Sequence, residues 1–187
     1  MVWKRPAFLV RVAQATILLL FFLFVRQTVS AAPFGQGEFG ADVPFGSATS
    51  LSVALGGNVS LSLAPSGPNF VASGSHTITI TSTDPVGYNL YIYSPSGTNM
   101  TGIPGTIPAS SNTVAGALAV NTWGYNTTGS TTNFLGMTTA PVLLKSAIGP
   151  FKTGDNTAVT YGVLTDITKS AGSYNVSITY TAVAINE

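Results

Sequence analysis

The stretch that decides the fold is residues 74–93, "GSHTITITSTDPVGYNLYIY". Its two halves alternate between apolar and polar side chains with a period of two, and the turn sequence "DPVG" separates them. Such alternation is typical of strands that have one buried and one solvent-facing side. We therefore predict two strands here. Their buried faces carry Ile78 and Ile80 in the first strand and Tyr88, Leu90 and Ile92 in the second.

The same pattern continues through most of the chain from residue 49 onward. Further alternating runs occupy residues 51–55, 58–64 and 157–165, and turn formers such as "PSGPN", "NTTGST" and "TGDN" separate the runs. No stretch after residue 31 has an apolar period of 3.6 residues, so we expect no helix there. Residues 49–187 are therefore predicted to form one all-β domain, an antiparallel β-sandwich of Ig-like or jelly-roll-like type. A single sheet closed on itself is the alternative.

The last alternating run is "AGSYNVSITYTAVAINE", residues 171–187. It predicts one long strand whose buried face carries Tyr174, Val176, Ile178 and Tyr180. We expect this strand to close the sandwich as a necessary part of the core.

The first 31 residues have the three parts of a secretory signal peptide. A basic start is followed by a mostly apolar run of 11 uncharged residues from Ala15 to Val25. "VSA" then supplies small side chains for cleavage between Ala31 and Ala32. An uncleaved membrane anchor is the alternative, but only 14 residues lie between Arg11 and Arg26, whereas a membrane span needs ~20.

Residues 32–48, "APFGQGEFGADVPFGSA", form an extended lead-in that glycine and proline interrupt. An extended segment of this kind can add as a strand to the sheet of a neighbouring molecule and place its large apolar side chains in pockets. The candidate strand-donor residues are Phe34, Phe39, Val43 and Phe45.

The charge balance changes when the predicted signal peptide is removed. The chain has seven basic and six acidic residues. Four basic residues precede residue 32, which leaves Lys145, Lys152 and Lys169 against all six acids, a net charge of −3. Phosphate contacts by Lys and Arg dominate nucleic-acid affinity, and residues 32–144 contain neither. We therefore expect no nucleic-acid partner, and membrane contact only through the signal peptide during export.

Residue types that support catalysis are scarce. The chain has no cysteine, and its one histidine, His76, is in phase with the predicted buried face, where we expect it at the end of a strand. Asp84, Asp155 and Asp166 fall in predicted turns, and a calcium site shared by Asp155 and Asp166 is a minor alternative. We predict a protein that is not an enzyme and that has no cofactor and no metal site.

Aromatic side chains beside Asn and Thr supply the candidate binding residues. Tyr91 and Tyr93 share the predicted outward face with Asn89, and "NTWGYNTTG" contains Trp123 and Tyr125. Exposed aromatic rings stack on sugars, so we take these four residues as candidate glycan contacts. Alternatively, Trp123 packs in the core and the tyrosines are ordinary cross-strand neighbours.

Four Asn-x-Ser/Thr sequons are candidate N-glycosylation sites, about as many as this composition produces by chance. They are at Asn58, Asn99, Asn126 and Asn175.

The segments "GYNLYI", "NTWGY", "VTYGV" and "GSYNVSITYTAVA" resemble those of short bacterial exported surface proteins, over roughly residues 75–185. These proteins share a G-Y-x-L strand, an N-x-W-G-Y segment and a G-x-Y-x-x-x-I-x-Y-T-A ending. The chain is also distantly similar to the WxL cell-wall-binding domain, with "GYNL" and "ITYTA" in place of the two Trp-x-Leu motifs. The resemblance implies a cell-surface β-sandwich.

The expected function is a secreted, extracellular surface protein with a structural or adhesive role and no catalysis. One alternative is a pilus or matrix-fibre subunit that assembles by strand donation, as fimbrial and camelysin-like proteins do, with copies of itself as partners. A second alternative is a cell-wall or glycan-binding module with surface glycans as partners.

Overall fold

The computed structural model describes residues 50–83, 86–103 and 105–185. Every regular element in these residues is a β-strand, which confirms the predicted all-β fold. Within the same residues no helix has the length and hydrophobicity that crossing a membrane requires. The strands are β1 (Leu51–Leu55), β2 (Ala64–Ser66), β3 (Asn69–Ser82), β4 (Tyr88–Tyr93), β5 (Met100–Gly102), β6 (Gly105–Ile107), β7 (Thr122–Asn126), β8 (Val142–Ala147), β9 (Phe151–Asp166), β10 (Tyr174–Asn175) and β11 (Thr179–Ala184).

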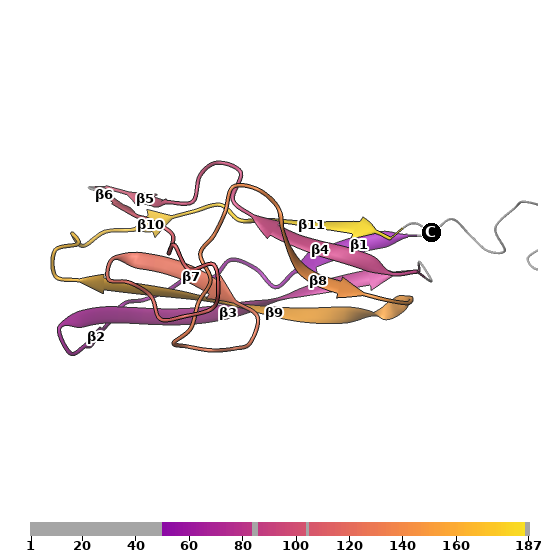
Figure 1. Ribbon diagram of the computed structural model, residues 1–187, viewed down its shortest axis with the longest axis horizontal. Coiled ribbons are helices and arrows are strands. Elements are labelled where there is room, and N and C mark those ends of the chain that lie inside the picture. The colour runs from indigo at the N-terminus through magenta and orange to yellow at the C-terminus, as the bar shows by residue number, and fades with distance from the viewer. Residues whose placement is uncertain (1–49, 84–85, 104, 186–187) are drawn as a thin grey trace, which may run out of the picture. The chain divides into compact units, whose positions relative to one another are not determined.

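Two long antiparallel strands, β3 and β9, pair with each other along most of their lengths and form the centre of the largest sheet (Figure 1). They belong to a sheet with the order β1-β3-β9-β7, in which β2 also pairs with β3. Two three-stranded sheets accompany it, with the orders β11-β4-β8 and β10-β5-β6. All strand pairs are antiparallel.

The sheets pack face to face, so the predicted sandwich is confirmed. Ile78 and Ile80 of β3 and Leu90 and Ile92 of β4 are each 0% exposed in the core between the sheets. Trp123 of β7 lies in the same core, and its indole Nε1 donates a hydrogen bond to the carbonyl of Thr98, 2.9 Å away. The period-two pattern predicted the inner faces of β3 and β4 correctly. Over its buried half, each of these strands is paired with a neighbouring strand on both edges, β3 with β1 and β9 and β4 with β11 and β8.

The predicted strand at residues 58–64 is not formed. Leu55 and Ala64 are nine residue steps apart, whereas their partners Ile78 and Val71 on β3 are only seven steps apart. The two extra residues make the intervening chain bow away from β3, so no ladder of hydrogen bonds joins them. The alternating apolar side chains still pack as a strand's would, since Val59 and Leu61 lie against the core.

The predicted single C-terminal strand is divided in two. Tyr174 and Asn175 pair with β5, whereas Thr179–Ala184 pairs with β4. Residues 176–178 cross from one sheet to the other. Their alternation persists through the break, with Val176 and Ile178 partly buried against the core.

The "TGDN" sequence at 153–156 lies inside β9 and is not a turn. Gly154 has a φ of 94°, and the register between β3 and β9 shifts near this point, between Ile80 and Ser82. The turn-forming residues of "TGDN" therefore form a β-bulge within β9.

The outer face of β7 and β9 is covered by the chain between β6 and β8. Phe134, which is 3% exposed, lies over Gly162 of β9, where a Cβ atom would be 2.1 Å from the ring's Cζ. Glycine at this position lets an aromatic ring lie directly on the strand.

Candidate functional site

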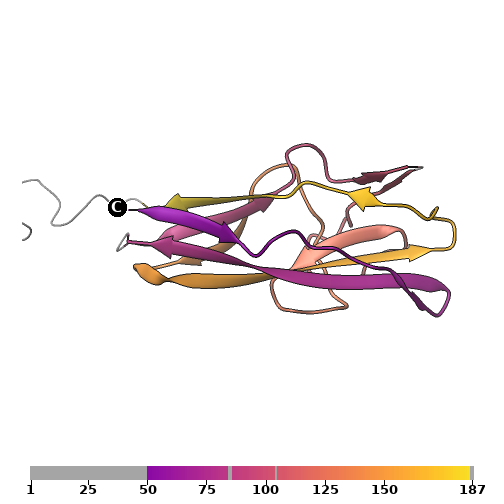
Figure 2. The same cartoon turned by 180° about the vertical axis from the view of Figure 1, so that it is seen from behind.

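A cavity that we call the slot has a volume of about 720 Å³ and opens between the sheets. One lip is the chain from Gly57 to Leu63, and the other is the chain from Gly172 to Ile178. Figure 2 shows the two lips on the same side of the molecule, as the violet chain between β1 and β2 and the yellow chain that leads to β11.

The floor of the slot is apolar. It is lined by side chains from four strands of two sheets: Met100, Ile107, Trp123 and Val163. Two large apolar side chains are exposed at its margins, since Leu55 is 54% exposed and Leu63 is 42% exposed. None of the lining residues is Asp, Glu, Lys or Arg, so the slot favours an uncharged occupant.

A chain of hydrogen bonds forms the polar end of the slot. His76 Nδ1 lies 2.9 Å from the carbonyl oxygen of Gly57, and His76 Nε2 lies 2.8 Å from the hydroxyl of Tyr180. Tyr180 in turn contacts the hydroxyl of Tyr161. A carbonyl only accepts, so Nδ1 carries the proton. In a neutral imidazole Nε2 then accepts from Tyr180, which leaves Tyr161 as the donor to Tyr180.

Both tyrosines keep their protons at neutral pH. Burial raises the pKa of Tyr161 to about 12. Burial, and then the proximity of Tyr161, raises the pKa of Tyr180 well above its ordinary value. The polar end of the slot therefore offers neutral hydrogen-bonding groups.

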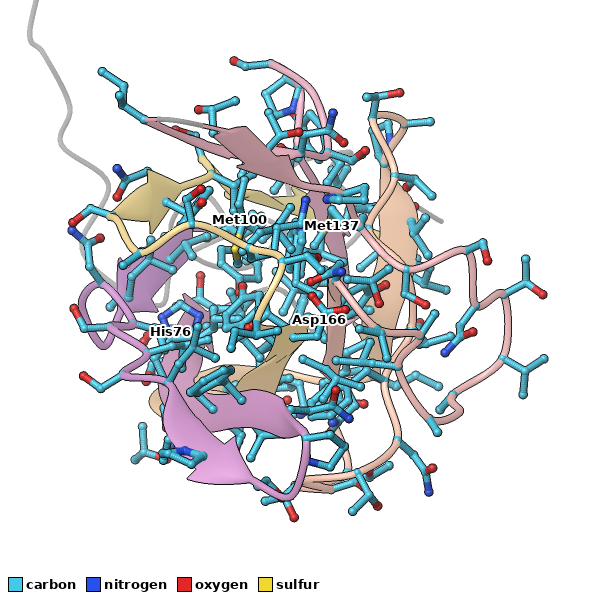
Figure 3. The ribbon with its side chains drawn as sticks, turned by 90° about the vertical axis from the view of Figure 1, so that its left-hand side faces the viewer. His76, Met100, Met137 and Asp166 are labelled. Carbon is cyan, nitrogen blue, oxygen red and sulfur yellow. The ribbon has the colours of Figure 1, made fainter. Side chains whose placement is uncertain are left out.

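His76 was predicted to lie at the end of a strand, and this prediction is wrong. The strand β3 already begins at Asn69, so His76 lies in its interior. Figure 3 labels His76 and Met100, which both line the slot, together with Met137 and Asp166.

Tyr91 and Tyr93 lie on the outer face of β4 and are partly exposed, as predicted. In the ladder they stand opposite Thr181 and Thr179 of β11. Leu143 of β8, which is 52% exposed, stands opposite Tyr91 on the other side. The sheet therefore presents two aromatic rings with hydroxyl-bearing neighbours.

Trp123 and Tyr125 do not share this surface, so their assignment as glycan contacts is corrected. Trp123 is 0% exposed and Tyr125 is 4% exposed. Both point into the core because they occupy alternate positions of β7, which pairs with the central strand β9. Neither ring is accessible to a sugar.

Three of the four sequons are exposed, at Asn58, Asn99 and Asn175. Asn126 is the exception, because it is 1% exposed. Its Nδ2 donates to the carbonyl oxygens of Ser130 and Asn133, at 2.8 and 2.9 Å. The nitrogen that a glycan would occupy is already used in the fold, so Asn126 is corrected from a modification site to a structural residue.

Asp155 and Asp166 do not meet, which excludes the calcium site that was the minor alternative for them. Both lie in β9, eleven residue steps apart, or about 36 Å at ~3.3 Å per step. No group of three or more His, Cys, Asp or Glu residues gathers in the described part of the chain.

Asp155 takes part instead in a link between the two layers. Its carboxylate accepts hydrogen bonds from Lys145 Nζ at 2.6 Å and from the Tyr88 hydroxyl at 2.7 Å. Burial alone would raise the pKa of Asp155, but the hydrogen bonds from Lys145 and Tyr88 outweigh it and lower that pKa. Burial, and then Asp155, raises the pKa of Tyr88 above its ordinary value.

Several predicted residues lie outside the described part of the chain. These are the cleavage residues Ala31 and Ala32, the strand-donor candidates Phe34, Phe39, Val43 and Phe45, and Asp84.

Sequence reasoning missed the slot and the link through Asp155. The slot forms because the chain between β1 and β2 is two residues longer than the part of β3 that lies opposite it. That difference depends on how the strands pair, which the sequence alone does not show. The link joins residues that lie 10 and 67 positions apart. The signal in the sequence for the link through Asp155 was Lys145, a single lysine at the end of the apolar segment "PVLLK".

No protein-family model matches the chain, and neither the curated proteins nor the solved structures contain a significant match to it.

Proposed function

We propose that this chain is an exported, non-catalytic β-sandwich protein that has a structural or adhesive role at the cell surface. The observation that carries the adhesive role is the outer face of β4. Tyr91 and Tyr93 stand two residues apart on this face, partly exposed and opposite two threonines of β11.

This face suits carbohydrate. An aromatic ring offers a flat apolar surface and a polar edge in the same side chain. Neighbouring threonine hydroxyls donate to and accept from sugar hydroxyls. The spacing of two strand residues separates the tyrosines by about 7 Å, so adjacent rings can engage one extended saccharide.

The proposed adhesion is tested with the exported chain on glycan arrays and on isolated cell walls. The double variant Tyr91→Ala/Tyr93→Ala is expected to lose binding, whereas Tyr91→Phe keeps most of it because the ring remains. Val183→Ala, a neighbour on β11, is the matched control. Full-strength binding by the double variant would exclude this face. Binding to isolated cell walls alone would favour the cell-wall module.

Export is tested separately. Mass spectrometry of the protein recovered outside the cell is expected to find an N-terminus at Ala32. A chain retained in the cytoplasm would contradict the proposed function as a whole.

A second candidate function is that of a fibre subunit assembled by strand donation. The slot favours it, because both lips leave backbone groups without hydrogen-bond partners. Electron micrographs of the exported chain are then expected to contain filaments that deletion of residues 32–48 abolishes.

A further inference from the structure

We infer that the slot is the receptor for residues 39–45 of a second copy of this chain. The inference rests on the second candidate function and names the acceptor that strand donation requires.

The lips of the slot present unpaired backbone groups. Within the described residues, the backbone of Asn58 to Leu63 makes no hydrogen bond. Across the slot, residues 176–178 belong to no strand. Within the part of the chain that the structure describes, the carbonyl of Ser177, which accepts from the hydroxyl of Ser94, is their only bonded backbone group. Backbone donors and acceptors without partners favour the addition of a strand.

The slot also has apolar surface that an added strand would cover. Leu55 and Leu63 expose about half of their surface at its margins, and Met100 is partly exposed, whereas Ile107 and Val163 beneath are already buried. Apolar surface in a concave site is stabilised by burial, at roughly 25 cal/mol per Å².

The sequence before β1 contains a segment with the matching pattern. In "FGADVPF", residues 39–45, the apolar side chains Phe39, Ala41, Val43 and Phe45 fall on one face of an extended chain. Gly40, Asp42 and Pro44 fall on the other, so the acidic residue would face solvent. Pro44 removes one N–H donor from only one of the two edges.

The lengths agree as well. The lip from Gly57 to Leu63 and the segment from Phe39 to Phe45 each cover six residue steps, which is about 20 Å in extended form.

Chain length indicates that the occupant comes from another molecule. Ser50 bonds to Thr83, and Gly57 bonds to His76, seven residue steps along β3, or about 23 Å. Phe45 is five residues from Ser50, and five residues reach at most about 18 Å. Phe45 of the same chain therefore falls short of Gly57, where the lip begins, so the same chain does not lay residues 39–45 along the lip.

The experiment uses pairs of single-cysteine variants of the exported chain, because the chain has no cysteine of its own. Phe39→Cys or Phe45→Cys is mixed with Leu55→Cys or Leu63→Cys and oxidised, so any mixed disulfide joins two molecules. Because a disulfide needs Cα atoms within about 7 Å, we expect one diagonal pattern. Phe39→Cys pairs with one end of the slot and Phe45→Cys with the other.

Val114→Cys is the matched control, since Val114 is 79% exposed and does not line the slot. Slot variants are expected to give several-fold more mixed dimer than this control. Equal yields would overturn the inference, and so would the absence of mixed dimers in folded proteins.

A second readout does not need cysteines. The chain has two tryptophans, Trp3 and Trp123. Trp3 belongs to the predicted signal peptide that export removes, so in the exported chain the fluorescence of Trp123, which lines the slot, reports occupancy. A peptide of residues 34–48 should change it saturably, whereas the same peptide with Phe39, Val43 and Phe45 replaced by Ser should not. Equal responses would contradict the inference. A chain that is exported and binds glycan but neither cross-links nor binds the peptide would overturn this inference alone.

Discussion

The imidazole Nε2 of His76 lies 2.8 Å from the hydroxyl oxygen of Tyr180, although 104 residues separate them in sequence. The contact joins β3 of the five-stranded sheet to β11 of a three-stranded sheet. Tyr180 also contacts Tyr161 of β9. One phenol therefore holds together three strands at the polar end of the slot.

Tyr180→Phe should destabilise the domain. The substitution keeps the ring but leaves His76 Nε2 and the Tyr161 hydroxyl without their partner. Loss of a partner for a buried polar group costs about 1–3 kcal/mol, which urea denaturation would measure. Tyr93→Phe is the control, because no hydrogen bond of the Tyr93 hydroxyl is present in the described residues. Equal effects of the two substitutions would contradict the role of the hydrogen-bond chain.

Asp155 should contribute to stability in a pH-dependent way. Its pKa is lowered in the folded state. Its contribution is therefore complete above the unfolded value of about 3.9 and is lost as the pH falls through the folded value. Asp155→Asn is expected to flatten the acid limb of the curve of unfolding free energy against pH. Lys145→Gln should move the acid limb to higher pH, because it removes a hydrogen bond that lowers this pKa. An unchanged acid limb in both variants would contradict the prediction.

Gly162→Ala should destabilise the domain because the new methyl group enters the Phe134 ring, whose Cζ would be 2.1 Å away. Overpacking of this kind costs about 1–3 kcal/mol, and thermal unfolding would detect it. Gly105→Ala is the matched control, since the nearest atom there is 4.0 Å from the added Cβ. Adding Phe134→Leu to Gly162→Ala should recover part of the loss. A Gly162→Ala variant as stable as Gly105→Ala would refute the packing.

Trp123→Ala should unfold the domain far more readily than Tyr91→Ala. The indole is 0% exposed and also donates to Thr98. Removal of a buried tryptophan costs about 3–5 kcal/mol. Tyr91 is only partly buried, so its replacement should cost much less. Denaturant midpoints of the two variants provide the comparison, and similar midpoints would place Trp123 outside the core.

Glycosylation should distinguish Asn126 from the other sequons. After secretion from a host that glycosylates exported proteins, Asn58, Asn99 and Asn175 are available for modification because they are exposed. Asn126 is buried and its Nδ2 is bonded. Glycopeptide mass spectrometry should find Asn126 unmodified. A glycan there would mean that modification precedes folding of β7.

The sequence predicted the inner faces of β3, β4 and β9 because alternation reports burial directly. Ile78 and Leu90 face the core as expected, and Val159, in the alternating run 157–165, does so as well. The core position of Trp123 was one of the two alternatives that the sequence left open, but the burial of Asn126 was harder to predict, because "NTWGYNTTG" surrounds it with polar residues. Asn126 is buried by the chain that covers the outer face of β7, where it bonds to Ser130 and Asn133, whereas Trp123 is buried by the opposite layer of the sandwich.

Alternation does not specify partners, and the remaining errors follow from this. Residues 58–64 have a strand pattern but lie opposite too few residues of β3. Residues 174–181 have one continuous pattern but change partner between Asn175 and Thr179. The slot is the space that these two irregular segments leave between them, so neither its existence nor its lining was accessible from the sequence.

The two ends of the described domain leave from the same place, and this determines how it would respond to tension. Ser50 bonds to Thr83, and Ile185 bonds to Gly87, on either side of a single turn. A force applied through these ends would peel β1 and β11 from their sheets one hydrogen bond at a time. A force applied through a segment seated in the slot would instead act along the strands and load many bonds together. With a donated segment seated in it, as we infer above, the slot would therefore be the mechanically stronger point of attachment.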